Sequence, residues 1–584
     1  MQTQQGNIIT GIKRYGRPYL IAMIAAIVFA MLGSISTIIG PNQLSKITNL
    51  VSAGLHGSID LMKIGHIVLI LGIIYVVGAV MSYTQGFIMA NVSQNFTRDL
   101  RTKISRKINV LPLRYFDQHD EGDTLSRVTN DLDTFGQSLN QSLGTVVSSS
   151  VLIVGTIIMM SFTNWMLSLT AVVSALLGMF GTMALLKHSQ KYFMAQQNKL
   201  AAVSGYVEEV YTGHEVVKTY NNGDNVRQKF KGLNDSLYDS VWRSQFISGI
   251  MQPLMTFIGN FSYVAVSVVG ALLVLNGTIS IGTVVAFMVY VRIFTQPLSQ
   301  ITQAFAGLQS AQAALHRVFE FLDEDEEPVV NSPEKLTTPI KGQIDFDHVG
   351  FGYNKDVPII KDFTAHVKPG QKVAIVGPTG SGKTTLISLL MGYYAYQQGS
   401  IKIDGVPVDR LTKETIRNQF DMVLQDTWLF EDTIMTNLKY NQTTISDDQV
   451  YTAAKAVGID HFIKTLPDGY DTVLDDSVTL SVGQKQLMTI ARALVRNKAM
   501  LILDEATSSV DTRTEEQLQQ AMDVLTKGRT SLVIAHRLST IKNADMILVL
   551  KDGEIIESGT HDVLMTQRGF YANLYNSQFE KLTA

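Results

Sequence analysis

Long apolar runs occupy the first half of the chain and are confined to it. Each run is long enough to cross about 30 Å of hydrocarbon as a helix that rises about 1.5 Å per residue. The pattern therefore predicts six membrane-spanning helices in a transmembrane domain of residues 1–322. They lie near residues 18–42, 62–90, 139–162, 165–187, 246–275 and 281–306.

Two polar segments between these spans, residues 91–137 and 188–245, are long and rich in Lys and Arg, whereas the other loops are short and nearly free of them. Basic loops remain in the cytoplasm, so both termini and both long loops are predicted to be cytoplasmic. Loops of this length are uncommon in compact proteins, so we expect the spanning helices to continue beyond the membrane. Short transverse helices at Tyr115–Arg127 and Glu208–Glu215 would join them; the alternative is that these segments are merely solvated charged helices.

The second half of the chain has a different pattern. The acidic run Asp323–Glu327, followed by a polar stretch, predicts a solvated linker over residues 323–340. From residue 341 to residue 584, short β-rich runs alternate with helical ones, which is typical of an α/β domain. The expected strands are residues 343–348, 372–376, 500–504, 531–535 and 546–550.

A glycine-rich loop follows the expected strand at 372–376 and precedes a helical run. In such a loop the glycines let backbone N–H groups face phosphates, and the strand–loop–helix context separates a working loop from a chance match. Lys383 is placed to reach the β- and γ-phosphates of a nucleotide, and Thr384 offers a hydroxyl to Mg²⁺. The nucleotide-binding residues of this segment are Gly377, Pro378, Thr379, Gly380, Ser381, Gly382, Lys383, Thr384 and Thr385.

Two adjacent carboxylates end the apolar strand Ala499–Leu503. Asp504 is placed to hold Mg²⁺ through water, as phosphate-loop nucleoside triphosphatases require, and Glu505 is placed to polarise the attacking water. A surface carboxylate pair is the alternative. An apolar strand that delivers both groups opposite a phosphate loop favours the catalytic interpretation.

The segment Leu480-Ser-Val-Gly-Gln484, ahead of Asp504, resembles the signature sequence of ATP-binding cassette (ABC) transporters. The resemblance covers nearly the whole chain, because six spans precede one cassette as in the ABC exporter half-transporters. It implies six transmembrane helices with long cytoplasmic extensions, followed by a phosphate-loop nucleotide-binding domain. It also implies ATP and Mg²⁺ as ligands, ATP hydrolysis coupled to transport, and a multi-pass protein of a bacterial cell membrane.

The same resemblance implies roles for other residues of the cassette. Tyr353 matches the aromatic residue that stacks on adenine, and Gln425 matches the glutamine that binds Mg²⁺ and senses the membrane domain. Asp511 lies in the segment that matches the loop crossing the dimer interface, and His536 matches the histidine that contacts the γ-phosphate. The two transverse helices are the parts of the membrane domain expected to reach a cassette, which makes Phe116 and Tyr211 candidate coupling residues.

The sequence has one cassette and no internal repeat, so the resemblance implies a dimer, in which the signature residues Ser481, Gly483 and Gln484 face a partner's nucleotide. The signature has Val482 where the family pattern has glycine, and the stretch Leu474–Thr479 before it is short and lacks a glycine. With the catalytic residues intact, this resembles the hydrolysis-competent subunit of heterodimeric bacterial multidrug exporters. The partner would then be a different half-transporter with an intact signature.

Homodimeric export of a lipid or peptide is an alternative to the heterodimer. A regulatory protein that binds ATP without turnover is a further alternative, but the intact Lys383, Glu505 and His536 argue against it. The resemblance implies amphipathic drugs or lipids as cargo.

Arg292 lies inside the sixth predicted span, where an ionisable residue usually faces a cavity or a partner group. Phe287, Met288 and Phe294 on the same helix could line a substrate cavity with it. A structural ion pair, a side chain that reaches toward the membrane surface, or ordinary helix packing are the alternatives.

Composition argues against three further features: a nucleic-acid partner, disulfides and thiolate metal sites. A net charge of −3 gives no basis for nucleic acid as a partner. The chain has no cysteine, so disulfides and thiolate metal sites are impossible.

Overall fold

The computed structural model forms two compact units, one of residues 1–109 and 120–324 and one of residues 110–119 and 325–584. We call them the membrane unit and the nucleotide unit. The predicted order of a helical domain before an α/β domain is confirmed. The structure describes residues 14–54, 58–354, 356–425, 427–440, 442, 444–475, 478, 480–504, 512–535 and 541–579.

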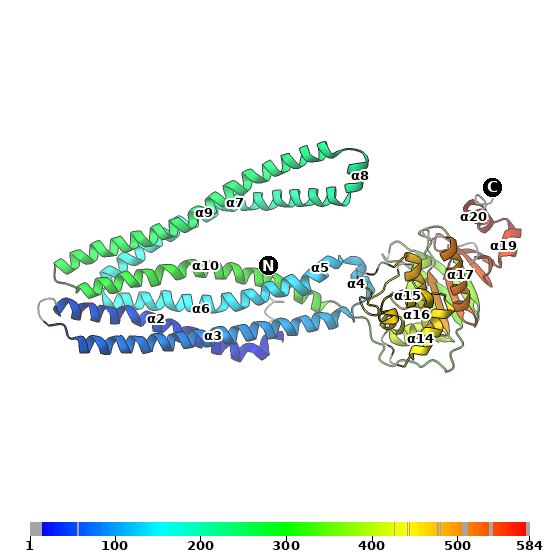
Figure 1. Ribbon diagram of the computed structural model, residues 1–584, viewed down its shortest axis with the longest axis horizontal. Helices are drawn as coiled ribbons and strands as arrows, with labels where there is room; N and C mark the ends of the chain where they lie inside the picture. Colours follow the sequence, from blue (N-terminus) through cyan, green and yellow to red (C-terminus); the bar gives the residue numbers. More distant parts are fainter. Residues whose placement is uncertain are drawn as a thin grey trace. The chain divides into compact units, whose positions relative to one another are not determined.

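Long helices build the membrane unit, and several of them lie side by side (Figure 1). The most extensive contacts join α6 with α10, α7 with α9, and α2 with α3. At 43 to 53 residues, α3, α7, α9 and α10 exceed any membrane crossing, so the predicted extensions are present. The long helices are α2 Leu20–Gly54, α3 Leu61–Ile108, α6 Leu132–Thr163, α7 Trp165–Thr212, α9 Gly223–Leu275 and α10 Ile281–Asp323.

Within the described residues, five helices are long and apolar enough to cross a membrane. They correspond to the first, second, third, fifth and sixth predicted spans. The fourth predicted span lies within α7, whose described apolar part is Trp165–Leu177. The apolar pattern of the sequence therefore located five helices that can cross a membrane, and the fourth predicted span stays a prediction.

Short helices connect the long ones and differ in part from the prediction. The first predicted turn-around contains α4 Leu113–Gln118, α5 Glu121–Ser126 and a π-helical turn, Arg127–Asp131. The second was placed wrongly, because α7 continues to Thr212 and the short helix α8 is His214–Thr219. Glu208 and Glu209 favour continuing α7, and the helix ends before Gly213. A 3₁₀ turn, Arg17–Tyr19, precedes α2.

The domain limits also differ from the expected 1–322, 323–340 and 341–584. Residues 110–119, which contain α4, belong to the nucleotide unit although α3 and α5 flank them in sequence. The linker is not simply solvated, since Glu327 pairs with Arg417 Nη2 at 2.9 Å and its backbone N–H donates to Val110 O at 2.9 Å. A charge run alone could not reveal these partners.

A ten-stranded sheet forms the centre of the nucleotide unit, in the order β5-β4-β1-β2-β10-β9-β3-β8-β7-β6. Strands β6, β7, β8, β3 and β9 are parallel neighbours. The strands are β1 Ile344–Phe351, β2 Ile360–Val367, β3 Lys372–Val376, β4 Gln398–Ile403, β5 Val406–Pro407, β6 Phe420–Val423, β7 Met500–Asp504, β8 Thr530–Ile534, β9 Met546–Lys551 and β10 Glu554–Gly559.

Both faces of this sheet are covered. On β7, Leu501 and Leu503 belong to one buried cluster and Met500 and Ile502 to another. A strand buried on both faces reads as a continuous apolar run, which is why the sequence located it. Besides α4, the described α-helices of this unit are α11 Lys383–Leu390, α12 Lys413–Arg417, α13 Ile434–Lys439, α14 Asp447–Ala456, α15 Asp460–Thr465, α16 Val482–Arg496, α17 Thr512–Thr526, α19 His561–Gln567 and α20 Phe570–Phe579.

Candidate nucleotide site

Four neighbouring parallel strands end at the same edge of the sheet, and each leads into a segment with candidate chemistry. The phosphate loop follows β3, Asp504 ends β7, and Gln425 comes two residues after β6. Ligands of open α/β sheets bind at the carboxyl ends of such strands. Glu505, directly after β7, and His536, two residues after β8, lie outside the described residues, as does Asp511.

The phosphate loop, residues 377–382, has three glycines at positive φ, and at two of them a Cβ would also collide with a neighbour. Gly382 has φ 99°, and a Cβ there would lie 2.5 Å from Ile360 Cδ1. Gly377 has φ 159°, and a Cβ there would collide with the carbonyl oxygen of Leu550. Between them, Pro378, Thr379 and Gly380 are exposed. The loop is therefore a glycine-dependent turn with an exposed centre at the start of α11, and turns of this kind bind phosphate.

Lys383, the first residue of α11, is buried, and its Nζ donates to Gly377 O and Pro378 O, both at 2.9 Å. Burial lowers the pKa of Lys383, and the nearby Asp504 carboxylate opposes that shift. The hydroxyl of Ser381 is buried and finds no hydrogen-bond partner among the residues that the structure describes. A cation and an unsatisfied polar atom around an open loop are features that a bound phosphate would complete.

The candidate Mg²⁺ ligands are Thr384, Gln425 and Asp504. Thr384 and Gln425 are exposed, and Asp504 is half-buried at the end of β7. Among the described residues, no cluster of three His, Cys, Asp or Glu side chains could hold a metal ion. A few oxygen ligands at an exposed edge fit Mg²⁺, which usually binds through one or two carboxylates together with substrate phosphates.

Tyr353 lies just after β1, and its hydroxyl is 3.3 Å from Thr385 Oγ1 at the start of α11. Its side chain is 43% exposed, so a ring face remains accessible. The structure thus brings the predicted adenine-stacking residue to the phosphate loop.

Ser481, the N-cap of α16, forms a reciprocal capping box with Gln484. The Gln484 backbone N–H donates to Ser481 Oγ at 3.2 Å, and the Ser481 N–H donates to Gln484 Oε1 at 2.8 Å. Gly483 is buried, whereas Val482 is 57% exposed at the first position of the helix. The predicted signature therefore sits at the start of a 15-residue helix, where backbone N–H groups and the helix dipole favour an anion.

The two candidate coupling residues have different environments. Phe116 is half-buried on α4, with its ring 5.5 Å from that of Tyr115. Tyr211 is 83% exposed near the end of α7. It lines a hollow of about 380 Å³ in the membrane unit, together with other residues of α7, residues of α9, and His214 at the start of α8.

The four candidate substrate-cavity residues do not share one surface. Phe287 and Phe294 are buried against other parts of the membrane unit. Met288 is half-buried, and Arg292 is exposed on α10. The two phenylalanines are thus packing residues of this chain, whereas Arg292 points away from that core.

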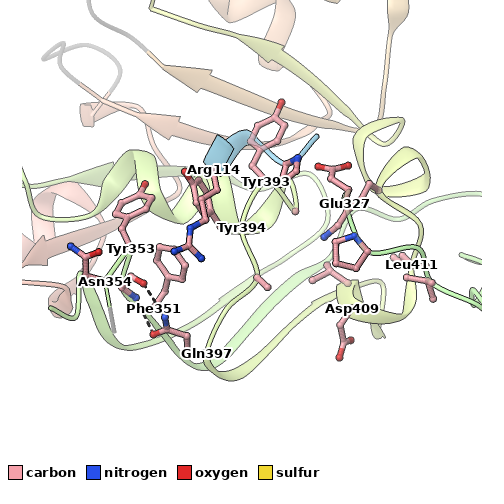
Figure 2. A pocket seen from close by; sticks show the side chains of 18 residues that line it. Arg114, Glu327, Phe351, Tyr353, Asn354, Tyr393, Tyr394, Gln397, Asp409 and Leu411 are labelled. Carbon is pink, nitrogen blue, oxygen red and sulfur yellow. Dashed lines mark hydrogen bonds between the residues drawn. The ribbon is translucent and has the colours of Figure 1, made fainter. Parts of the chain in front are cut away.

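The position of Tyr394 was not predicted from the sequence. Tyr394, four residues after α11, packs edge-on against Tyr353 and donates a hydrogen bond to the Asp117 carboxylate of α4. Figure 2 shows Tyr353, Phe351 and Tyr394 gathered around one part of a hollow in the nucleotide unit. The only signal in the sequence was the cluster of tyrosines at 393, 394 and 396, which has no spacing tied to a known chemistry.

Comparison with known proteins places both units. A family described as "ABC transporter transmembrane region" matches residues 23–298, and one described as "ABC transporter" matches residues 360–508. The chain is 43% identical over 499 residues to a fatty acid ABC transporter ATP-binding/permease protein of Mycobacterium tuberculosis, covering 85% of this chain and 79% of the relative.

Two further similarities extend over most of the chain. An ATP-dependent lipid A-core flippase of Saccharophagus degradans is 36% identical over 518 residues, covering 88% of this chain and 86% of the relative. A solved structure of a bacterial Atm1-family ABC exporter with ATP bound superposes with a TM-score of 0.75 at 26% identity. It covers 96% of this chain and 98% of that chain.

Proposed function

Because the chain belongs to the ABC transporter family and has the domain order of its exporters, in which ATP hydrolysis is coupled to transport, we propose that it exports amphipathic compounds across the cell membrane. The observation that carries this proposal is the convergence of the phosphate loop, Asp504 and Gln425 at one sheet edge, in a chain that also bears membrane-spanning helices.

This placement supports a division of labour among the site residues. Lys383 would hold the β- and γ-phosphates of ATP, and Thr384, Asp504 and Gln425 would hold Mg²⁺. Glu505 would orient the attacking water at the end of β7. His536, two residues after the neighbouring strand β8, would contact the γ-phosphate.

The charges of the predicted spans support a cargo with an acidic head group. The six predicted spans contain no Asp or Glu, and the only charge in their interior is Arg292. An exposed guanidinium on a spanning helix is costly against lipid, so it would face a water-filled path or a partner. A path that contains an unopposed cation favours amphiphiles with an acidic head group. The fatty acid and lipid A relatives carry names of compounds of this kind.

The finer proposal is a heterodimer. In the family arrangement, the signature of one chain faces the phosphate loop of the other. The exposed Val482 side chain would then project where a partner's γ-phosphate has to approach the backbone of α16. Glycine would allow that approach, whereas a β-branched side chain hinders it. This chain's phosphate loop with a partner's intact signature would make the active site, and Ser481 would serve a slower one.

A homodimeric lipid exporter is a second candidate, favoured by the names of the lipid-transporting relatives. The two candidates differ in what the chain does alone. The test is to purify the chain by itself in lipid, and separately with the half-transporter that co-purifies from the native host, and to compare their ATPase rates.

The heterodimer proposal expects little ATPase from the chain alone and restoration by the partner. In the complex, Glu505→Gln should abolish turnover, whereas Ser481→Ala should only slow it. Robust amphiphile-stimulated ATPase from the chain alone would overturn the heterodimer and support the homodimer. Absence of ATP-dependent amphiphile transport from both preparations would overturn the proposed cargo class.

A further inference from the structure

A hollow of about 600 Å³ lies in the nucleotide unit between α4 and the segment that follows α11 (Figure 2). Arg114 of α4 lines it, together with Tyr353, Tyr393, Tyr394 and the linker residue Glu327. This is where the segment inserted between α3 and α5 meets the residue expected to stack on adenine.

A continuous series of contacts crosses this region. The rings of Tyr353 and Tyr394 have centroids 5.0 Å apart and planes at 86°, an edge-to-face geometry that aromatic pairs favour. Phe351 supports Tyr394 from β1, at 5.6 Å between centroids. The Tyr394 hydroxyl then donates to the Asp117 carboxylate. A single side chain, Tyr394, therefore touches both the adenine-site aromatic and α4.

The neighbouring residue, Tyr393, secures the other side of the hollow. The Arg417 guanidinium lies over its ring at 5.0 Å and pairs with the Glu327 carboxylate at 2.9 Å. The Glu327 backbone N–H donates to Val110 O at 2.9 Å. These contacts hold the linker beside the segment that leads into α4. The backbone of that segment is therefore anchored next to Tyr394.

The protonation state of Tyr394 suits it to donate. Burial and the Asp117 carboxylate both raise the pKa of the Tyr394 hydroxyl. The hydroxyl therefore keeps its proton throughout the physiological range, and the bond to a charged acceptor is of the stronger kind.

We propose that Tyr394 is a positioning residue that transmits the occupancy of the adenine site to α4, through its ring contact with Tyr353 and its hydrogen bond to Asp117. The inference rests on the proposed function in taking Tyr353 as the residue that stacks on adenine. Stacking fixes the orientation of the Tyr353 ring. The edge contact passes that constraint to Tyr394, and the hydrogen bond passes it to the segment that connects α3 and α5.

Tyr394→Phe tests the hydrogen bond, because it keeps the ring and removes only the hydroxyl. Losing a hydrogen bond to a charged group corresponds to about a tenfold effect or more. We expect the number of amphiphile molecules transported per ATP hydrolysed to fall about tenfold, while the KM for ATP changes less than about twofold. Tyr353→Leu should instead raise the KM for ATP.

Two further variants separate transmission from a structural role. Asp117→Asn keeps an acceptor and should retain coupling, whereas Asp117→Leu should match Tyr394→Phe. Tyr396→Phe is the matched control, because Tyr396 interacts with Asp409 inside the nucleotide unit and not with α4. It should leave transport per ATP at the wild-type level.

A measurement that needs no transported compound makes this test independent of the proposed transport function. Hydrogen exchange of the α4 amides should slow when ATP is added to the wild-type protein and the Tyr396→Phe control, but not to Tyr394→Phe. If α4 in Tyr394→Phe responds to ATP as in the wild type, the inference is wrong even if transport is confirmed. If no amphiphile is transported but the α4 response follows this pattern, the proposed cargo fails and the inference stands.

Discussion

Asp421 and Arg529 form an ion pair shielded from water, with Arg529 Nη1 3.2 Å from Asp421 Oδ2 and the Asp421 side chain fully buried. The backbone N–H of Lys498 donates to the same carboxylate at 2.8 Å. Asp421 lies on β6, the edge strand that leads to Gln425, whereas Arg529 directly precedes β8 inside the sheet. The pair therefore ties the edge strand, and with it the candidate Mg²⁺ ligand, to the sheet interior.

Asp421→Ala should destabilise the nucleotide unit severely, because it leaves the Arg529 guanidinium buried without its partner. Breaking a buried pair in this way costs about 3–5 kcal/mol. Thermal unfolding of the full-length protein should show a clearly lower midpoint than the wild type. The exposed Asp356→Ala serves as control and should unfold close to the wild-type temperature. Equal midpoints for the two variants would contradict the anchoring role.

Gly382→Ala should impair ATP binding, because its φ of 99° and the 2.5 Å approach to Ile360 leave no room for a methyl group. Binding of a fluorescent ATP analogue to the purified protein measures the effect. Gly559→Ala is a suitable control, since a Cβ there meets its neighbours at ordinary distances of 3.5 Å and more. Normal affinity in Gly382→Ala would mean that the loop does not hold the phosphates.

Glu505→Gln should keep ATP binding and remove turnover, because it preserves shape and loses the carboxylate that orients water. The rate should fall by a factor of order 10² or more, as is typical of a positioned base. Steady-state ATPase and nucleotide binding are measured on the same preparation. Lys383→Ala should differ by weakening binding itself. Near-normal turnover in Glu505→Gln would assign the catalytic carboxylate elsewhere.

Arg292→Gln should reduce the preference for acidic cargo, because it removes the only interior charge of the predicted spans. The measurement is the ratio of transport of a carboxylate amphiphile to that of its methyl ester in proteoliposomes. A charge-assisted contact predicts about a tenfold fall in this ratio. Arg292→Lys keeps the charge and should preserve most of the preference. An unchanged ratio in Arg292→Gln would argue for a structural role.

Tyr211→Glu should separate ATP hydrolysis from transport, since a charge would occupy the apolar hollow at the end of α7. Tyr220→Glu is the comparison, because Tyr220 is similarly exposed at 78% but does not line that hollow. We expect transport per ATP to fall only in Tyr211→Glu. Parallel loss of ATPase and transport in a folded protein would place the coupling contact elsewhere, for example at Phe116.

Features that depend on local pattern were predictable from the sequence. The phosphate loop between β3 and α11 was recognised because its residue types and its strand–loop–helix context are both local. Strand β7 was recognised because its apolar run is continuous. Helix periodicity located α10 but did not determine which side of it packs, so Phe287 and Arg292 were grouped although only one is buried.

Features that depend on distant partners were not predictable. Glu327 belongs to an acidic run that looks solvated until Arg417 is placed beside it. The second transverse helix was misplaced because the Glu pair at 208 and 209 favours continuing α7, and the end of the helix is decided at Gly213. Tyr394 was missed because its acceptor lies 277 residues earlier in the chain.

That separation has a consequence for the order of events during synthesis. At translation rates of roughly 5–20 residues per second, α4 would leave the ribosome about 14–55 s before Tyr394. Throughout this interval α4 has no nucleotide unit to bind. Its exposed Arg114, Asp117 and Gln118 are compatible with a solvated segment during that time. Insertion of α3 and α6 into the membrane can therefore precede the docking of α4.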